Sequence, residues 1–411
     1  MARDNVTTKG TPAQAMALID DKEFIKCIVQ EALQAILEAE MTEHIGAERY
    51  ERSDGRRSVR NCYKPRTLKL SVGKIELAVP QSRDGEFSTE LFGRYQRSEK
   101  ALVLALMEMY VLGVSTRDVA DITEALCGTT FSKTTVSELC RALDAQVAAW
   151  KARDLSGCAY PYLFVDAIYE KVRVDGVAVS QGVLIVSAVR SDGRRDLLDV
   201  IIADTESEAT YAELFRGLKE RGVTGVVQVT SDDHLGLKAA VGRYFQGAAW
   251  QRCQVHFVRN ATGKVAWKHR RQLSSDINAV FAETTREAAI AKAAEVADRW
   301  RDTAPSVAKM IDTDIEECLS VLALPLEHRK RTRTNNGIER FNEEIRRRTR
   351  TIRVFPNRES ALRLIGTLCM EQGEEWITGK RYLDMSLLYA QQDGQAAEVR
   401  ELVVEEMRKV G

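Results

Sequence analysis

Residues 158–265 contain the pattern that most constrains how this chain can fold. Three segments rich in β-forming residues follow one another, with DG-type turns between them: PYLFVDAIYEKVRV, VAVSQGVLIVSAVR and RRDLLDVIIADT. A helical segment (SEATYAELFRGLKERG), a strand (VVQVTSDD), a second helical segment (LGLKAAVGRYF) and a last strand (AAWQRCQVHFV) complete the series. The order β-β-β-α-β-α-β predicts an α/β, ribonuclease H-like fold.

Two aspartates interrupt these strands. Asp166 shares a strand face with Phe164 and Ile168, where a carboxylate costs energy unless it is paired or bound to metal. Asp232 ends a later strand, where α/β folds place ligand-binding groups, and Asp233 and His234 follow it. The plainer alternatives are a turn contact for Asp166, and a helix cap by Ser231 or Asp232.

A third acidic residue lies in RTNNGIERFNEEIRRRTR, residues 333–350. The spacing predicts a helix capped by Asn335 or Asn336, with Ile338, Phe341 and Ile345 on its apolar face. Glu339 lies on the opposite face, together with Asn342 or Glu343 and with Arg346. A solvated, self-paired charged face is the alternative for this helix.

The N-terminal 150 residues are predicted to form helices, a basic loop and one β-hairpin. Residues 13–48 have helical periodicity, with an apolar stripe predicted at Phe24, Ile25, Ile28, Leu33, Ile36 and Leu37. A basic loop, GRRSVRNCYKPR, precedes a predicted β-hairpin, LKLSVGKIELAVP. Residues 99–150 contain two short helices, with Ser115 and Ser132 as N-caps, that predict a helix-turn-helix or a plain helical hairpin.

Charge distribution matters more than total charge here. The 60 basic and 60 acidic residues cancel, but residues 50–70 carry seven Lys/Arg against two acids, and residues 328–353 carry ten against three. Such local patches suit phosphate contact. The eight scattered cysteines favour neither a disulfide framework nor a zinc ribbon, and neither a signal peptide nor a membrane-length apolar run is recognisable. We therefore expect a cytoplasmic protein.

Four segments resemble the bacterial Mutator-like transposases of insertion sequences. FVDAIYEKVR is similar to the family's first-aspartate motif, SDDHLGL to its second, and QRCQVHFVRN to its Cys-x-x-His motif. The stretch from LALPLEHRKRTRTNNGIERF to MEQGEEW resembles its C-terminal signature, and NCYKPRTLKLSVGKIELAVPQSRDGEF its N-terminal module. The resemblance covers nearly the whole chain.

The resemblance implies a catalytic and metal-binding triad of Asp166, Asp232 and Glu339 that holds two Mg²⁺ ions, for which Mn²⁺ would substitute. Glu339 follows Asp232 by 107 residues, and a helical insertion at 266–326 fills that gap. The expected supporting residues are His234, Cys253, His256, Asn336 and Asn342, although Cys253 and His256 could instead form a buried structural pair. The expected DNA contacts are Arg56, Arg57, Arg60, Lys64, Arg66, Arg259, Arg333, Arg340, Arg346, Arg347, Arg348 and Arg350.

The implied function is a DNA transposase that cleaves and joins strands at its terminal inverted repeats. The implied partners are double-stranded DNA, both the repeats and a target, and a second copy in a homodimer. No nucleotide cofactor or membrane is expected, and the absence of a Gly-rich phosphate loop beside the strands speaks against a small-molecule α/β enzyme. The rivals are a non-catalytic DNA-binding protein such as a domesticated repressor, a metal-dependent nuclease, and, least favoured, a small-molecule enzyme.

We predict seven parts. They are an N-terminal helix used for dimerisation (1–48), a small basic β module (49–97), a helix-turn-helix-like domain (98–152), the first part of the core (153–265), the helical insertion (266–326), the second part of the core with Glu339 (327–392) and a charged tail (393–411).

Overall fold

The computed structural model of the chain describes residues 22–49, 51, 55–70, 73–89, 100–111, 114, 116–127, 136, 138 and 140–394. The chain divides into two compact units, Met1–Arg141 and Ala142–Gly411, each of which is considered by itself. None of the helices in the described ranges is long and apolar enough to cross a membrane.

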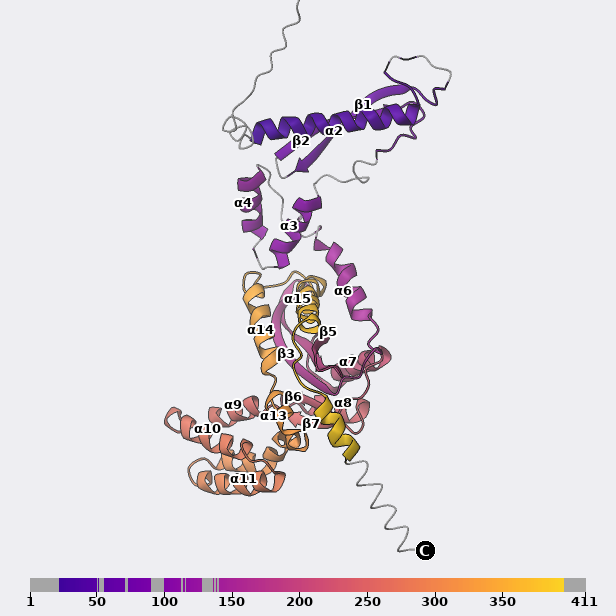
Figure 1. The fold of residues 1–411 in the computed structure, drawn as a ribbon. Coiled ribbons are helices and arrows are strands. Elements are labelled where there is room, and N and C mark those ends of the chain that lie inside the picture. Colours follow the sequence, from indigo (N-terminus) through magenta and orange to yellow (C-terminus); the bar gives the residue numbers. More distant parts are fainter. Residues whose placement is uncertain are drawn as a thin grey trace, which may run out of the picture. The chain divides into compact units, whose positions relative to one another are not determined.

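In the first unit, one helix packs on a β-hairpin. Helix α2 (Lys22–Ile45) covers strands β1 (Arg60–Leu70) and β2 (Gly73–Ser82), which pair antiparallel (Figure 1). The hairpin was predicted, but β1 begins at Arg60, inside the predicted basic loop. The predicted stripe of α2 is wrong at Ile28 and Ile36, which are exposed, because the face that packs on the hairpin runs through Leu33 and Leu37.

Two further helices of this unit are α3 (Lys100–Val111) and α4 (Thr116–Cys127). The predicted caps Ser115 and Ser132, and most of the predicted second helix, lie outside the described residues. The helix-turn-helix therefore stays a prediction.

The second unit is built on a five-stranded mixed sheet in the order β5-β4-β3-β6-β7. Strands β3, β4 and β5 form an antiparallel meander, and β6 and β7 continue the sheet parallel to β3. The predicted order of three strands, helix, strand, helix and strand is confirmed. The bounds are β3 (Tyr162–Val174), β4 (Val177–Val189), β5 (Arg195–Ala203), α7 (Glu208–Glu220), β6 (Gln228–Ser231), α8 (Leu235–Tyr244) and β7 (Ala249–Arg252).

Alternating residues of β3 face two different layers. Leu163 and Val165 pack into a core with residues of α7 and α8. Tyr162 and Phe164 point the other way, into a core with Ile338 of α14 (Asn336–Thr349). The period of two therefore puts Asp166 on the α14 side of the strand. Helix α15 (Arg358–Thr378) packs on β5 and on α6 (Ala142–Ala152).

A helical layer follows β7. The predicted last strand, AAWQRCQVHFV, is wrong beyond Arg252: the strand stops there and helix α9 begins, because Phe257 and Ala261, one turn apart, are buried in the core of this layer. Figure 1 shows the helices gathered beside the ends of β6 and β7. They are α9 (Gln254–Gly263), α10 (Trp267–Phe281), α11 (Arg286–Trp300) and α12 (Pro305–Asp314), followed by 3-10 turns at Ile315–Cys318 and Ser320–Ala323 and by α13 (Leu326–Thr332).

Replacing Trp300 with phenylalanine should destabilise this layer by about 1–2 kcal/mol. The buried indole N–H donates to Asp276 over 2.9 Å, and phenylalanine would remove that donor while keeping the ring. Thermal unfolding measures the change. Trp267→Phe is the matched control, because Trp267 is 84% exposed and should tolerate the substitution. Equal melting temperatures for the two variants would contradict the assigned role of Trp300.

Candidate active site

Strand pairing brings the two aspartates together. Phe164 of β3 pairs in parallel with Thr230 of β6, and each aspartate lies two residues beyond its paired residue. Asp166 and Asp232 therefore emerge side by side on the same face of the sheet. The shared face of Asp166 and Phe164 that the sequence predicted is confirmed by the packing of Phe164.

The segment before α14 carries Glu339 to the same place. The hydroxyl of Thr230 donates to the carbonyl of Thr332 over 2.8 Å, which fastens this segment to β6. The amide of Asn335 donates to the carbonyl of Val165 over 2.9 Å, next to Asp166. Asn335 is thus the N-cap residue by position, but its side chain bonds to β3 and makes no cap hydrogen bond.

The predicted faces of α14 are confirmed. Ile338, Phe341 and Ile345 are buried, and Glu339 is only 25% exposed. Asn342 is buried as well, and its amide donates to Asp166 Oδ2 over 2.7 Å. Of the two alternatives for that face, Asn342 is the residue turned toward the carboxylates, and Glu343 is exposed.

His256 of α9 lies between two of the three acids. Its Nδ1 contacts Asp232 Oδ1, and its Nε2 lies 3.1 Å from Glu339 Oε1. Burial alone lowers the pKa of His256, but hydrogen bonds to Asp232 and Cys253 outweigh this and raise the pKa to about 10. The imidazole is therefore held as a cation between carboxylates. Arg259, one turn along α9, adds a guanidinium 3.5 Å from Glu339.

Asp166, the acid that His256 does not bridge, has a raised pKa because its surroundings are buried and acidic. Burial and the neighbouring charge of Asp232, with a smaller contribution from Glu339, raise the pKa of Asp166 to about 7. Carboxylates that repel one another in this way gain from a bound cation. Their hard oxygen donors suit a divalent ion such as magnesium.

Cys253 precedes α9 and is completely buried. The backbone N–H of Asn335 donates to its Sγ over 3.5 Å, so the thiol links α9 to the start of α14. Donor atoms of Asp232, Cys253 and His256 lie within 4.8 Å of one another. Cys253 and His256 therefore both lie at the site. Cys253 contacts the start of α14 there, and His256 contacts Asp232 and Glu339.

Asp233 and His234, the two residues that follow Asp232, bond to groups outside the cluster of three acids. Asp233 pairs with Arg252 over 2.9 Å, which separates it from Asp232. His234 is the N-cap of α8, accepts from the N–H of Leu237 over 3.4 Å and packs against Tyr211. The predicted cap by Ser231 or Asp232 is therefore wrong, since His234 takes that position. Asn336, the other predicted supporting residue, is exposed at the first position of α14.

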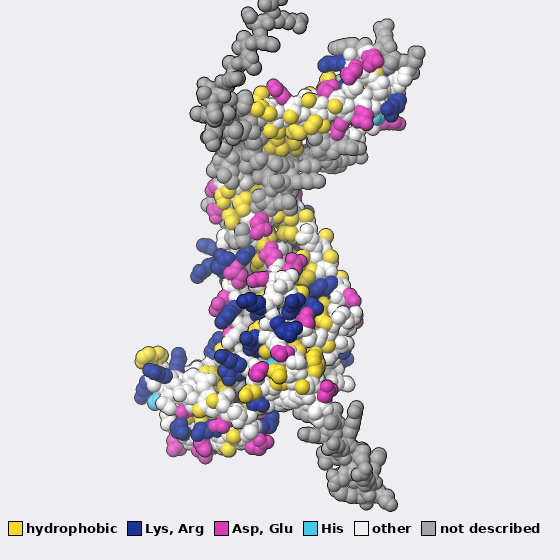
Figure 2. All heavy atoms as spheres, in the orientation of Figure 1, with side chains coloured by type: hydrophobic (Ala, Val, Ile, Leu, Met, Phe, Trp, Pro, Cys, Tyr) yellow, Lys and Arg dark blue, Asp and Glu magenta, His cyan; other side chains and the backbone are white. Residues whose placement is uncertain are grey.

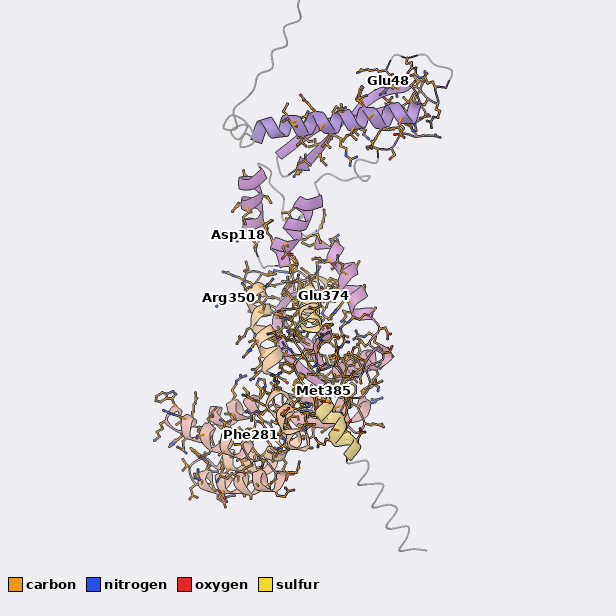
Figure 3. The ribbon with its side chains drawn as sticks, in the orientation of Figure 1. Glu48, Asp118, Phe281, Arg350, Glu374 and Met385 are labelled. Carbon is orange, nitrogen blue, oxygen red and sulfur yellow. The ribbon has the colours of Figure 1, made fainter. Side chains whose placement is uncertain are left out.

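The basic end of α14 is partly self-paired. Arg347 and Arg348 each contact Glu344 over 2.7 Å, and this pairing lowers the pKa of Glu344 to about 2. Arg346 and Arg350 are exposed, and Figure 3 shows Arg350 at the end of the helix. Figure 2 shows Lys and Arg side chains gathered over this region. The helix therefore combines internal ion pairs with outward-facing arginines.

The other predicted basic contacts have varied surroundings. Arg56 and Arg57 bond to backbone carbonyls within the first unit, and Arg60 pairs with Glu38 over 2.9 Å. Lys64 is exposed and Arg66 is half-buried. In the second unit Arg340 is exposed, and Arg333 is half-buried beside the cavity that Gln254 and Lys330 line.

Sequence reasoning missed the roles of two residues. Asn335 was considered only as a cap, although its side chain joins α14 to β3. Arg252, which is buried and pairs with Asp233 and Asp314, was not considered at all. The one available signal for Arg252 was an arginine at the end of a core strand, where it needs acidic partners.

The family model and the sequence relatives agree on one family. A family model described as "Transposase, Mutator family" matches residues 1–379. The chain is 43% identical over 381 residues to the transposase for insertion sequence element ISRM5 of Rhizobium meliloti, covering 92% of this chain and 96% of the relative. It is 38% identical to the transposase for IS256 in transposon Tn4001 of Staphylococcus aureus, covering 93% and 98%. The Drosophila P element transposase strand transfer complex matches 73% of this chain and 83% of its own at 8% identity, with a TM-score of 0.30.

Proposed function

This chain belongs to the Mutator family of transposases, and we propose that Asp166, Asp232 and Glu339 form its catalytic centre for DNA strand cleavage and strand transfer. The observation that carries the proposal is the convergence of these three acids. They come from β3, the end of β6 and α14, and His256 bridges two of them. In this proposal the five-stranded sheet is a ribonuclease H-like core, and its strand order supports that assignment.

The three carboxylates would hold two divalent cations, Mg²⁺ in the cell, with Mn²⁺ as a substitute. When bound, such ions lower the pKa of the attacking hydroxyl and stabilise the leaving oxygen. The donor set fits this role, because the acids are all oxygen ligands, and burial together with the neighbouring charge of Asp232 raises the pKa of Asp166. The imidazolium of His256 holds two of the acids together before the ions enter.

The protein's own groups position the DNA. The side-chain amide of Asn342 orients Asp166 by donating to its Oδ2. Arg259 and the outward arginines of α14 bind phosphates flanking the scissile bond, and this binding should weaken steeply with added salt. We assign recognition of the terminal inverted repeats to the first unit, including the predicted helix-turn-helix. A homodimer acting on two element ends in the cytoplasm completes the proposal.

The test is a cleavage and joining assay on DNA that carries the inverted repeats flanking the gene. The wild-type protein should nick the element end and join it to a second strand in Mg²⁺ or Mn²⁺, and should do neither in EDTA. Asp166→Asn should bind the DNA and leave it intact. Nicking without joined product would indicate a nuclease. Binding without cleavage by the wild type would leave a DNA-binding protein and overturn the catalytic assignment.

A pair of neighbouring substitutions tests which aspartate acts. Asp232→Asn should lower the cleavage rate on the order of 10³-fold, because it removes a charge from the carboxylate centre. Asp233→Asn should lower it by about tenfold at most, since Asp233 pairs with Arg252 and Arg252 retains Asp314. Single-turnover cleavage rates measure both. A larger loss from Asp233→Asn than from Asp232→Asn would reverse the assignment.

A further inference from the structure

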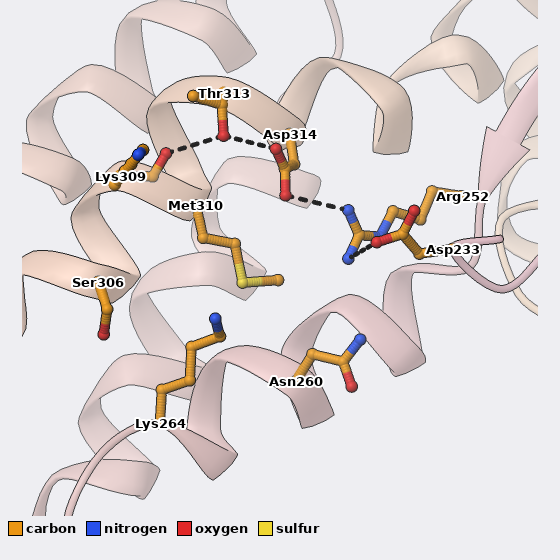
Figure 4. A pocket seen from close by; sticks show the side chains of 9 residues that line it. All are labelled: Asp233, Arg252, Asn260, Lys264, Ser306, Lys309, Met310, Thr313 and Asp314. Atoms are coloured by element: carbon orange, nitrogen blue, oxygen red, sulfur yellow. Dashed lines mark hydrogen bonds and ion pairs between the residues drawn. The ribbon is translucent and has the colours of Figure 1, made fainter. Parts of the chain in front are cut away.

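A cavity of about 430 Å³ opens between α9, α12 and the end of β6. Figure 4 shows Arg252, Asn260, Lys264 and Met310 around a common space. The lining residues are Asp233, Arg252, Asn260, Lys264, Ser306, Lys309, Met310, Thr313 and Asp314. The volume lies within the range of small-ligand sites and is far too small for a duplex.

On one wall of the cavity, a single arginine pairs with two aspartates, so these three side chains keep a net charge of −1. Arg252 is only 3% exposed, and it contacts Asp233 over 2.9 Å and Asp314 over 3.2 Å. Figure 4 shows these two ion pairs at the edge of the space. Both acids are therefore held by Arg252, and with Lys264 and Lys309 the charged side chains that line the cavity sum to +1.

Two lysines on facing walls remain available. Lys264 follows the last residue of α9 and Lys309 belongs to α12, and both are exposed. Within the described ranges, neither ammonium has an acidic side chain at ion-pair distance. Asn260 and Ser306 add neutral hydrogen-bonding groups, and Figure 4 shows the apolar side chain of Met310 between the walls. The cavity thus offers two cations for a phosphate. Met310, which packs in the core of the helical layer and is only 6% exposed, adds a small apolar contact for a base.

Helix α9 connects this cavity to the catalytic carboxylates. His256 contacts Asp232 and Glu339, Asn260 lies one turn further, and Lys264 a second turn further. The eight residues from His256 to Lys264 span about 12 Å of helix. A few nucleotides of an extended DNA strand are enough to cover that distance. Asp233 lines the cavity directly after Asp232.

We propose that this cavity binds one unpaired nucleotide of the DNA strand, a few positions from the phosphate held at the three carboxylates. Lys264 and Lys309 take its phosphate, and Met310 contacts its base. The inference rests on the proposed function, because the strand reaches the cavity from the active site. An unpaired nucleotide is required, since a paired base cannot enter a space of this size.

The test compares two DNA duplexes of equal length in EDTA, so that no cleavage takes place. One is fully paired and the other has a short unpaired thymidine end. Fluorescence anisotropy should show that Lys264→Gln combined with Lys309→Gln weakens binding of the unpaired end about tenfold and leaves the paired duplex unchanged. Lys268→Gln is the matched control, because it removes the same charge from an exposed position on α10 outside the cavity.

Photocrosslinking locates the nucleotide. With 5-iodouracil in the unpaired end, the wild type should crosslink within α9 or α12, and the double variant should lose that crosslink. Equal losses on both duplexes, crosslinks elsewhere, or competition by inorganic phosphate as strong as that by thymidine monophosphate would each overturn the proposal. A wild type that prefers the unpaired end through these lysines but never cleaves would sink the proposed function and keep the nucleotide site. A wild type that cleaves the DNA but does not prefer the unpaired end would support the proposed function and overturn the nucleotide site.

Discussion

Replacing Glu339 with glutamine should reduce DNA cleavage on the order of 10³-fold or more, while Glu343→Gln should leave the rate within about twofold. Both glutamates lie on α14, about one turn apart, and the substitution removes one negative charge at either position. Glu339 is 25% exposed, lies 3.1 Å from His256 and faces the two aspartates. Glu343 is exposed to solvent. The comparison therefore separates the charge of the catalytic centre from the charge of the helix.

The measurement is the single-turnover cleavage rate at saturating Mg²⁺, with DNA affinity and melting temperature recorded for each variant. Glu339→Gln should bind DNA at least as tightly as the wild type, because it removes a negative charge near phosphates. Its melting temperature should stay close to that of the wild type, since glutamine keeps the shape of the side chain. Equal rates for the two variants would remove Glu339 from the catalytic centre.

Gly193→Ala should destabilise the second unit by about 3 kcal/mol or more, whereas Gly176→Ala should cost about 1 kcal/mol. Both glycines have a φ of 82°, so alanine meets the same backbone strain at each. A Cβ at Gly193 would lie 1.9 Å from the carbonyl oxygen of Leu383, and a Cβ at Gly176 would meet nothing within 4 Å. The difference between the variants isolates the close approach of the two chain segments.

Urea unfolding of the full chain, followed through the helical signal, gives the two free energies. The close approach has a reason, since the carbonyl of Gly193 accepts from the N–H groups of Tyr382 and Leu383 over 2.7 and 3.0 Å. If Gly193→Ala costs no more than Gly176→Ala, the segment at Leu383 is not held against this turn.

Periodicity was enough to predict the parts of the site that depend on one element. A period of two put Asp166 on the face of Phe164, and a period close to four put Ile338, Phe341 and Ile345 opposite Glu339. These features follow from the geometry of a strand and a helix. They hold wherever the element packs.

Predictions failed where burial from elsewhere in the chain decided the outcome. QVHFV has the composition of a strand, but Phe257 forms part of the helical core, so the segment is a helix that presents His256 to the acids. The cap of α8 was also misjudged, because His234 takes that position. Asn335 does take the cap position of α14, but its side chain bonds to β3 and makes no cap hydrogen bond.

The sequence by itself determined the order of strands and helices and the family, because these depend on local pattern and on motifs read along the chain. From the same motifs it also predicted the three acids of the proposed centre. Only the tertiary structure distinguished the surroundings of Asp232 from those of Asp233, since their partners, His256 and Arg252, lie about 20 residues further along the chain. It also decided that the side chain of Asn335 joins the start of α14 to β3, through the carbonyl of Val165. Contacts between residues so far apart depend on how the elements pack, and the spacing of residues within any one element does not encode them.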